Sequence, residues 1–394
     1  MPSLRQVAHE IAIAARLAAR SLGRRLSGAS TPVVTDAEFR ATLAPWIESL
    51  PSDLTRGHAF LRIGPREAWL DTGLILEPGD TVTLLAAGRV YFSRTLDVWV
   101  GPSLRLWCRV GAGNPVFRSA RDTLTFTATE SGQLSLSSRF PGEWLDPAGS
   151  QETSAPEFAG ASGDLSVLAV LWAREADVHG LFSRFGKDAR VPGLVLAEAE
   201  RLEEAASPPS LWQHDWRIGA SEVFGTAPVP GGRQGIGCCT HGDVGILQRD
   251  ARMPLAPDIR LEWTWRVQQL PSDLAEDTIP SHDYLSIAVE FDDGQDITYF
   301  WSATLPEGTT FRCPLPVWRD IESHVVVRSG NRGLGQWLDE KRDLYADYRR
   351  IVGGPAREVV RVWLIGESVM QRGHGRCEYA SIRLATNERT LDVL

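Results

Sequence analysis

The stretch AWLDTGLILEPGDTVTLLAAGRVYF, residues 68–92, holds two aliphatic and β-branched runs that are separated by the turn sequence Pro78-Gly79-Asp80. Short runs of this kind, bounded by Gly and Pro, predict β-strands. Similar runs follow at regular spacing up to residue 173. Strands at this spacing, with turn residues between them, predict a β-sandwich or barrel over residues 59–173.

A second β-rich stretch occupies residues 212–394. Its runs at 261–268 and 284–291 alternate apolar and polar side chains, which is the period of a half-buried strand. Residues 174–211 lie between the two stretches and are predicted to form a helical connector, whose helix ends before Pro208-Pro209. The predicted fold is therefore mainly β, with two β-sandwich (jelly-roll-like) domains.

Residues 1–58 are predicted to hold an N-terminal amphipathic helix and a helical lead-in. Apolar residues recur at helical spacing from Leu4 to Leu22, and arginines occupy much of the remainder. One interpretation is an interfacial helix that makes peripheral membrane contact through residues 1–27. The other is a helix that packs on the protein's own surface.

Composition limits the class of protein. The net charge of −9 argues against a nucleic-acid partner, because phosphate binding requires a clustered positive field. Five cysteines are too few, and odd in number, for a secreted disulfide scaffold, so a cytoplasmic location is expected. The interfacial interpretation of residues 1–27 would make the protein membrane-peripheral there. An apolar run of 18 residues is absent from the sequence, and no membrane-spanning helix is expected. The oligomeric state stays open.

The first domain resembles the bacterial calcium-dependent galactose lectins. The resemblance rests on Thr72-Gly73, Pro78-Gly79-Asp80, Ala86-Ala87-Gly88, Gly101-Pro102 and the runs 123–138 and 163–171. It implies a β-sandwich in which calcium and sugar bind together. The family's Tyr ligand falls here at Tyr91 or Phe92, and Arg139 stands where an acid is expected. Glu143 and Asp146 remain as oxygen donors, so retention of calcium is open.

The second domain resembles an uncharacterised bacterial family, the domain of unknown function 3047. The resemblance rests on residues 261–266, Leu270-Pro271, His282-Asp283-Tyr284, Glu290-Phe291-Asp292, 298–301 and 325–330. It implies a jelly-roll-like sandwich by analogy of fold, and it implies no activity.

The polar faces of the second domain's strands supply the candidate site. A carboxylate and an imidazole on one face are the groups that general acid–base catalysis requires. The predicted catalytic residues are Asp283, Glu290 and His324. The predicted ligand-binding residues are Arg266, Tyr284 and Arg328, together with Trp99 and Trp144 of the first domain, whose rings can stack on a sugar. The alternative is a flat sheet face crossed by ion pairs.

A metal or a cofactor is not predicted. Cys238-Cys239-Thr240-His241 and His374-Gly375-Arg376-Cys377 could converge on zinc, but neither has the two-residue cysteine spacing of structural zinc sites. The leading hypothesis is recognition of a glycan, or of another polyhydroxylated or small amphiphilic ligand, with the main site in the second domain. The alternatives are an enzyme of lyase, isomerase or hydrolase type, and a membrane-peripheral interaction protein.

Overall fold

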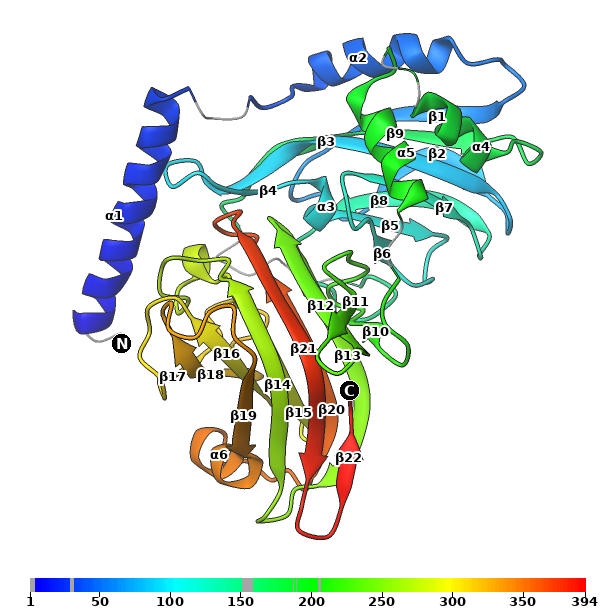
Figure 1. Ribbon diagram of the computed structural model, residues 1–394. Helices are drawn as coiled ribbons and strands as arrows, with labels where there is room; N and C mark the ends of the chain where they lie inside the picture. The colour runs from blue at the N-terminus through cyan, green and yellow to red at the C-terminus, as the bar shows by residue number, and fades with distance from the viewer. Residues whose placement is uncertain (1–3, 29–31, 151–158, 187, 189, 205–206) are drawn as a thin grey trace. The chain divides into compact units, whose positions relative to one another are not determined.

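The computed structural model describes residues 4–28, 32–150, 159–186, 188, 190–204 and 207–394 (Figure 1). The chain divides into two compact units. The N-terminal unit comprises Leu17–Ala205, and the C-terminal unit comprises Met1–Arg16 and Ala206–Leu394. The helix α1 (Leu4–Leu26) therefore contributes residues to both units.

The N-terminal unit contains two antiparallel sheets. The five-stranded sheet has the order β1-β9-β3-β4, with β7 paired to β3, and the four-stranded sheet has the order β2-β8-β5-β6. The strands are β1 (Thr55–Ile63), β2 (Leu70–Leu76), β3 (Thr81–Ser93), β4 (Val98–Val100), β5 (Leu106–Val110), β6 (Phe117–Arg118), β7 (Thr123–Thr127), β8 (Gly132–Ser138) and β9 (Ser162–Trp172). The predicted lectin-like stretch is thus a two-sheet sandwich.

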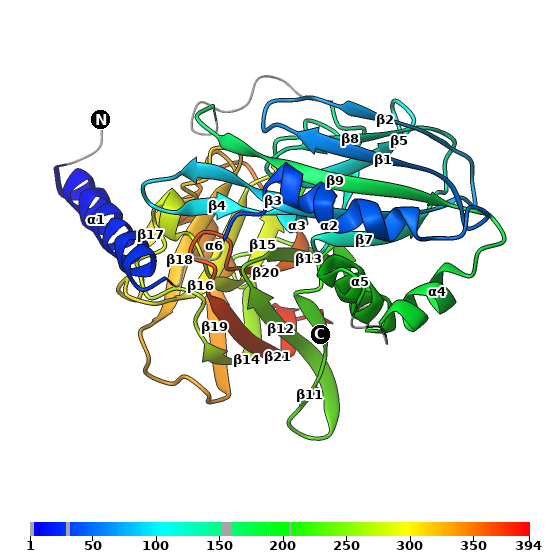
Figure 2. The same cartoon turned by 90° about the horizontal axis from the view of Figure 1, so that it is seen from above.

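Helices cover the outer face of the five-stranded sheet, as Figure 2 shows from above. They are α2 (Asp36–Glu48), α4 (Val178–Phe185) and α5 (Gly193–Glu203), while α3 (Pro102–Arg105) is a single turn before β5. The helix α2 begins directly after Thr35, which forms a capping box with Glu38. Their apolar side chains form one core with the sheet, including Phe39, Trp46 and Trp172.

Strand β3 is buried on both faces over much of its length, because one face meets the helices and the other meets the second sheet. Leu84 and Leu85 are adjacent in sequence, and both are fully buried. The strand also runs very close to β9: a Cβ at Gly88 would lie 2.4 Å from the carbonyl oxygen of Asp164. Residue 88 also has φ +116°, so the Ala-Ala-Gly sequence of the opening stretch requires its glycine.

The C-terminal unit is a second two-sheet sandwich. Its sheets have the orders β10-β13-β20-β15-β16-β18-β17 and β11-β12-β21-β14-β19, with β22 paired to β21. The bounds are β10 (Gln213–His214), β11 (Phe224–Val229), β12 (Arg233–His241), β13 (Val244–Pro254), β14 (Arg260–Gln269), β15 (Leu285–Phe291), β16 (Asp296–Ser302), β17 (Thr310–Arg312), β18 (Glu322–Ser329), β19 (Leu338–Asp343), α6 (Leu344–Ile351), β20 (Glu358–Glu367), β21 (His374–Ala385) and β22 (Thr390–Asp392).

The core of this unit lies between the two sheets. The apolar faces predicted from the two-residue alternation both point into it: 261, 263, 265 and 267 from β14, and 285, 287, 289 and 291 from β15. Several tryptophans of the chain are therefore core residues, among them Trp263, Trp265 and Trp301. The mainly β fold with two sandwiches is confirmed.

The opposite face of the seven-stranded sheet is also buried, which the alternation did not predict. Ser286, Thr298 and His324 lie on this face and are fully buried. The face is covered by two segments of the same unit, residues 270–284, called here the roof loop, and residues 313–321. The expected choice between an open cleft and a flat solvated face is thus replaced by a third arrangement, a polar layer enclosed by loops.

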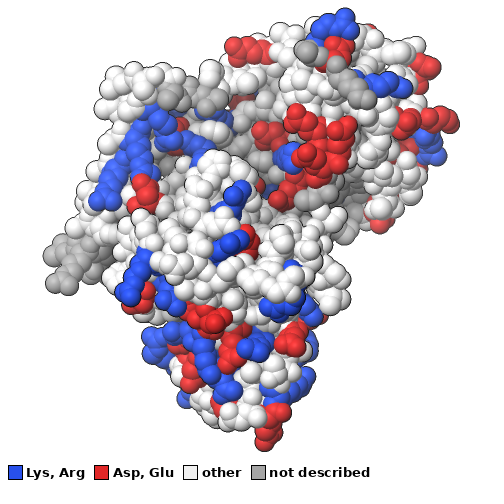
Figure 3. Space-filling view, in the orientation of Figure 1, with Lys and Arg blue, Asp and Glu red and all other residues white. Residues whose placement is uncertain are grey.

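The helix α1 exposes apolar side chains to solvent. Ile13 and Leu17 are buried, but Ile11 is 63% exposed and Leu26 is 80% exposed. Basic side chains lie along this helix in Figure 3. Of the helices in the described part of the chain, none combines the length and apolar character that crossing a membrane requires.

Candidate functional site

Four side chains with metal-ligating atoms meet in the enclosed polar layer of the C-terminal unit. They form the HCEH cluster: His282, Cys313, Glu322 and His324. Their potential ligand atoms all lie within 4.8 Å of one another, and all four residues are buried. In the part of the chain that the structure describes, they are the group in which three or more such ligands gather. The roof loop supplies His282, the segment after β17 supplies Cys313, and β18 supplies the other two.

His282 is held in one orientation by the backbone of its own loop. Its Nδ1 lies 2.5 Å from the carbonyl oxygen of Glu276, so Nδ1 carries the proton and donates it. This leaves the lone pair on Nε2, which faces the Sγ of Cys313 at 3.4 Å. Burial lowers the pKa of His282 to about 4, so the ring is neutral at pH 7.

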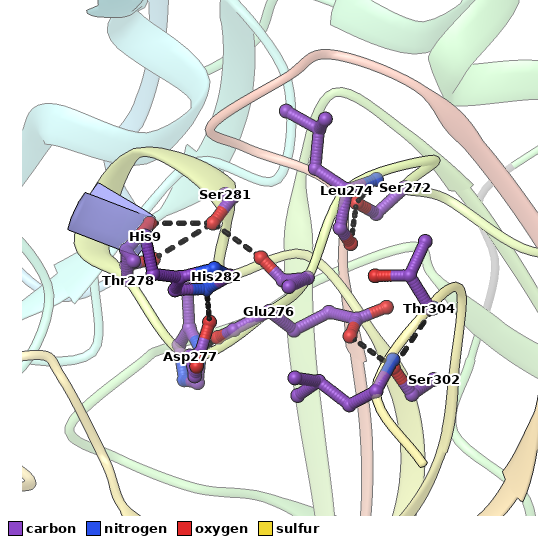
Figure 4. A network of polar contacts seen from close by, with 12 residues as sticks. His9, Ser272, Leu274, Glu276, Asp277, Thr278, Ser281, His282, Ser302 and Thr304 are labelled. Carbon is purple, nitrogen blue, oxygen red and sulfur yellow. Dashed lines mark hydrogen bonds and ion pairs between the residues drawn. The ribbon is translucent and has the colours of Figure 1, made fainter. Parts of the chain in front are cut away.

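The roof loop is anchored by the side chain of Glu276 (Figure 4). Its carboxylate accepts hydrogen bonds from the hydroxyl of Ser302 and, at 2.6 Å, from the backbone N–H of Ala303 at the end of β16. Burial raises the pKa of Glu276 to about 8 in spite of these bonds. A hydrogen bond between the hydroxyl groups of Thr278 and Ser281 closes the loop just before His282. These contacts fix where His282 points.

His324 sits among aromatic rings and has no hydrogen-bond partner. Its ring stacks on Phe311 at a centroid distance of 4.9 Å and meets Tyr284 edge-on at 5.1 Å. Both ring nitrogens are buried without a hydrogen-bond partner. Burial, followed by the proximity of His282, lowers the pKa of His324 well below its ordinary value. A buried polar atom without a partner is rare in folded proteins and requires an explanation.

Glu322 and Cys313 bring acidic groups into the same enclosed space. Glu322 accepts a hydrogen bond from the hydroxyl of Thr298 at 2.9 Å, and its Oε1 lies 3.5 Å from Nε2 of His324. Burial raises the pKa of Glu322. Burial and the nearby Glu322 raise the pKa of the Cys313 thiol well above its ordinary value. Two anions this close in a buried site require a neighbouring cation or a proton.

A pocket adjoins the HCEH cluster on the side of Cys313. This Asp277 pocket has a volume of about 710 Å³. It is lined by His9, Glu10 and Ala14 of α1, by Asp277, Thr278, Ile279 and Pro280 of the roof loop, and by Phe311, Arg312, Cys313, Pro314 and Arg319. His9 and Asp277 form an ion pair at 2.8 Å across it. All of its lining residues belong to the C-terminal unit.

The structure brings three of the predicted site residues together. Asp283 and Tyr284 follow His282 in the roof loop, and the Tyr284 ring touches His324. Asp283 is fully buried, and its two carboxylate oxygens accept the backbone N–H groups of Met370 at 2.8 Å and Gln371 at 2.7 Å. Burial raises the pKa of Asp283 to about 7. Asp283 therefore anchors the roof loop to residues 370–371.

Glu290 lies on β15, the strand that follows the roof loop, and does not belong to the HCEH cluster. Both of its carboxylate oxygens bind Nη1 of Arg361, at 2.8 and 2.9 Å, and one accepts Nε1 of Trp363 at 3.2 Å. The reason is strand length: at about 3.3 Å per residue, Glu290 is about 20 Å along the chain from Tyr284. It is therefore held in an ion pair at the far end of β15.

The predicted ligand-binding arginines also lie elsewhere. Arg266 is on the other sheet, where it forms a bidentate ion pair with Glu378. Arg328 was expected on the face of His324, but it binds Glu340 of β19 instead. The physical reason is a register shift in the β16–β18 pairing just before Arg328, which breaks the two-residue alternation.

The two tryptophans predicted for ligand binding differ in their exposure. Trp144 is buried, with its ring stacked on Trp69 at 5.0 Å. Trp99 lines a cavity of about 500 Å³ in the N-terminal unit, where the guanidinium of Arg89 lies 4.0 Å from its ring centre.

The two acids considered for calcium bind backbone groups of their own loop. Glu143 accepts the N–H of Phe140 at 2.7 Å, and Asp146 accepts that of Ala148 at 2.9 Å. Neither belongs to a set of three or more ligating side chains among the residues described. Arg139 is also buried.

The cysteines and histidines considered for zinc do converge, but not on one point. Strand pairing places His241 opposite His374, with their Nδ1 atoms 2.8 Å apart. The Sγ of Cys239 lies 3.0 Å from the other ring nitrogen of His241. Since these contacts use opposite sides of one ring, the three groups cannot enclose a single ion. Cys238 and Cys377 face the core.

Sequence reasoning missed His282, Cys313 and Glu322 as site residues. The four cluster residues are spread from 282 to 324 and have none of the short spacings of known metal motifs. One signal was present: Glu322-Ser323-His324 places two ligands two residues apart, which is the same face of a strand. The other two ligands come from loops, whose path the sequence does not reveal.

Comparisons with known proteins locate a family match in the C-terminal unit. Residues 229–383 match the family described as a protein of unknown function, DUF3047. The match contains the whole HCEH cluster. It spans less than half of the chain. A search of curated proteins finds no match.

Solved structures similar to parts of the chain include carbohydrate-binding domains. The PllA-like lectin domain of EclA is 14% identical, with 31% of this chain and 99% of that chain covered and a TM-score of 0.23. TmCBM61 in complex with β-1,4-galactotriose is 9% identical, with 46% of this chain and 91% of that chain covered and a TM-score of 0.24. The xyloglucanase domain of NopAA from Sinorhizobium fredii, in complex with cellobiose, is 10% identical, with 45% of this chain and 100% of that chain covered and a TM-score of 0.28. At these TM-scores, the likenesses carry no conclusion about the ligand of this chain. What the comparisons establish is that its C-terminal region is similar to the DUF3047 family.

Proposed function

We propose that the C-terminal sandwich binds a small polyhydroxylated ligand, such as a mono- or oligosaccharide, in the Asp277 pocket. The observation that carries this proposal is the pocket itself. Its volume of about 710 Å³ is in the range of pockets that enclose small molecules, about 300–1,000 Å³. Its lining combines an aromatic ring with charged groups of both signs.

The lining chemistry suits a neutral ligand that carries many hydroxyl groups. Asp277 and Glu10 supply carboxylate acceptors, and Arg312 and Arg319 supply donors. The ring of Phe311 supplies an apolar surface against which the C–H face of a sugar can pack. The wall carries both acidic and basic side chains, so a strongly charged ligand of either sign would be repelled by some of them.

A glycan array probed with the labelled full-length chain tests the proposal. Hits are then measured by calorimetry, with cellobiose and β-1,4-galactotriose as defined soluble probes. We expect Asp277→Asn and Arg312→Gln each to weaken binding about tenfold, since each removes a charged hydrogen-bond group. Asp320→Asn is the matched control, because Asp320 is exposed on the same covering segment and does not line the pocket.

Two results would count against the proposal. One is an array without hits together with no heat of binding for the two soluble sugars. The other is binding that neither pocket variant weakens, which would place the ligand elsewhere on the chain, for example at Trp99 in the N-terminal unit.

A further inference from the structure

We infer that the HCEH cluster is a zinc site in which His282, Cys313, Glu322 and His324 are the four ligands. The inference goes beyond the proposed function and does not depend on it. It rests on two observations that are independent of each other, the spacing of the ligand atoms and the unsatisfied histidine, and the ligand types then select the ion.

The ligand atoms have the spacing of a tetrahedral zinc site. With metal–ligand distances of about 2.0–2.3 Å, neighbouring ligand atoms in such a site lie about 3.3–3.7 Å apart. Nε2 of His282 is 3.4 Å from Sγ of Cys313, and Nε2 of His324 is 3.5 Å from Oε1 of Glu322. All four atoms lie within 4.8 Å of one another. One ion can therefore reach all four with small rotations of the side chains.

The hydrogen bonds around the cluster leave the ligand atoms available. The backbone carbonyl of Glu276 takes the proton of His282 Nδ1, which is the usual outer contact of a metal-bound histidine. Thr298 fixes the carboxylate of Glu322 by donating to Oε1, as Tyr284 does at 3.4 Å, and a carboxylate with about four lone-pair positions can accept these bonds and still bind an ion. His324 is fully buried, and neither of its nitrogens has a hydrogen-bond partner. A metal ion supplies the missing partner for one of them.

The charges select a divalent cation that accepts both sulfur and nitrogen. When bound to a metal, a thiolate and a carboxylate would contribute two negative charges and the two neutral imidazoles none, so the four ligands match the charge of Zn²⁺. Calcium and magnesium are disfavoured because they prefer oxygen ligands only. Zinc accepts Cys, His and Glu ligands in tetrahedral geometry, and four protein ligands describe a closed site of the structural kind.

Such an ion would add a coordinate link between segments that are otherwise joined by non-covalent contacts. It would link the roof loop through His282 and residues 313–321 through Cys313 to β18 through Glu322 and His324. Both covering segments form walls of the Asp277 pocket. The zinc ion would thus hold the wall of the pocket in place without itself contacting a ligand there.

Elemental analysis and cobalt substitution on the full-length chain test the inference. We expect about one zinc per chain by mass spectrometry of the protein purified without an affinity tag that binds metal. After removal of zinc by a chelator and addition of Co²⁺, we expect the visible bands of tetrahedral cobalt and a thiolate-to-cobalt charge-transfer band. Cys313→Ser should abolish the charge-transfer band, and His324→Gln should lower the metal content at least tenfold.

Cys239→Ser is the matched control. It removes the other thiol that lies beside a histidine in this unit, so a zinc ion at the HCEH cluster predicts an unchanged cobalt spectrum. If Cys239→Ser abolished the charge-transfer band and Cys313→Ser did not, the site would be the surface group of Cys239 and His241, and the inference would fail. It would also fail if the wild-type chain bound neither stoichiometric zinc nor cobalt with a thiolate band. This second criterion uses the wild-type chain alone, so the misfolding of a variant does not affect it.

Discussion

Replacement of Asp283 by Asn separates a structural role of this residue from a catalytic one. The two oxygens of its buried carboxylate accept the backbone N–H groups of Met370 and Gln371. An Asn side chain retains one acceptor, but its NH₂ group would face the second backbone N–H. The variant therefore leaves one buried donor without a partner and places two donors in contact.

The size of the effect follows from these two contacts. A buried polar group without a partner costs about 1–3 kcal/mol. The loss of the buried negative charge offsets part of this, since burial disfavours the ionised form and raises its pKa. We expect a net loss of about 2 kcal/mol in the local stability of the roof loop and residues 370–371.

Hydrogen–deuterium exchange with mass spectrometry measures this local stability. A loss of about 2 kcal/mol corresponds to roughly 25-fold faster exchange in peptides that cover residues 270–284 and 368–373. Asp320→Asn, on the exposed part of the second covering segment, is the control. Unchanged exchange in Asp283→Asn would refute the anchoring role. If ligand turnover or binding were lost at the same time, Asp283 would act at the site itself.

Four further outcomes are expected. In Asp80, burial raises the pKa, but hydrogen bonds from the backbone N–H of Glu77 and from its arginine partners outweigh it and lower the pKa. The folded pKa is thus below the unfolded one, so the stabilisation by Asp80 is present above about pH 4 and is lost as the pH falls. In urea denaturation, the free energy of unfolding of Asp80→Asn should be about 1–2 kcal/mol below that of the wild type at pH 7, and the two should approach each other near pH 2.5. The loss is small because the arginine partners of Asp80 are partly exposed to solvent. Trp144→Ala should lower the stability of the N-terminal unit by about 3–5 kcal/mol in a thermal scan, because the ring is buried; an unchanged transition would contradict its packing. Glu290→Gln should lower the free energy of unfolding by about 1–2 kcal/mol, because it weakens the ion pair with Arg361. A fully stable variant with altered turnover would instead favour the enzyme hypothesis. If α1 contacts membrane, Ile11→Glu should reduce flotation with anionic liposomes, and equal flotation of variant and wild type would exclude this contact.

The strand faces could be predicted from the sequence, because a strand's side chains alternate with a period that depends on the backbone alone. Leu285, Ile287 and Val289 point into the core as the pattern required. The capped helix α2 also followed from local signals, since Thr35 and Glu38 are three residues apart. Local geometry decided both features.

The site could not be predicted in the same way. His324 was identified as a candidate, but its partners Cys313 and His282 come from loops that fold back over the sheet. Arg328 was misplaced because one register shift reverses the alternation after it. Trp144 was expected at a ligand surface, but Trp69 covers its ring. Each difference arises from contacts between segments that are distant in the chain.

The opening stretch 68–92 determined that the N-terminal unit is made of short strands, and the alternation at 261–268 and 284–291 determined which faces of the C-terminal strands are apolar. Those properties depend on backbone geometry and on the removal of apolar groups from water, which act over a few residues. The tertiary structure alone decided that the polar face would be enclosed rather than solvated. The roof loop and residues 313–321 cover it, and they bring Cys313 and His282 to Glu322 and His324 across about 40 residues of chain. Burial then removes water from these four groups, and it is this enclosure that makes them a candidate metal site.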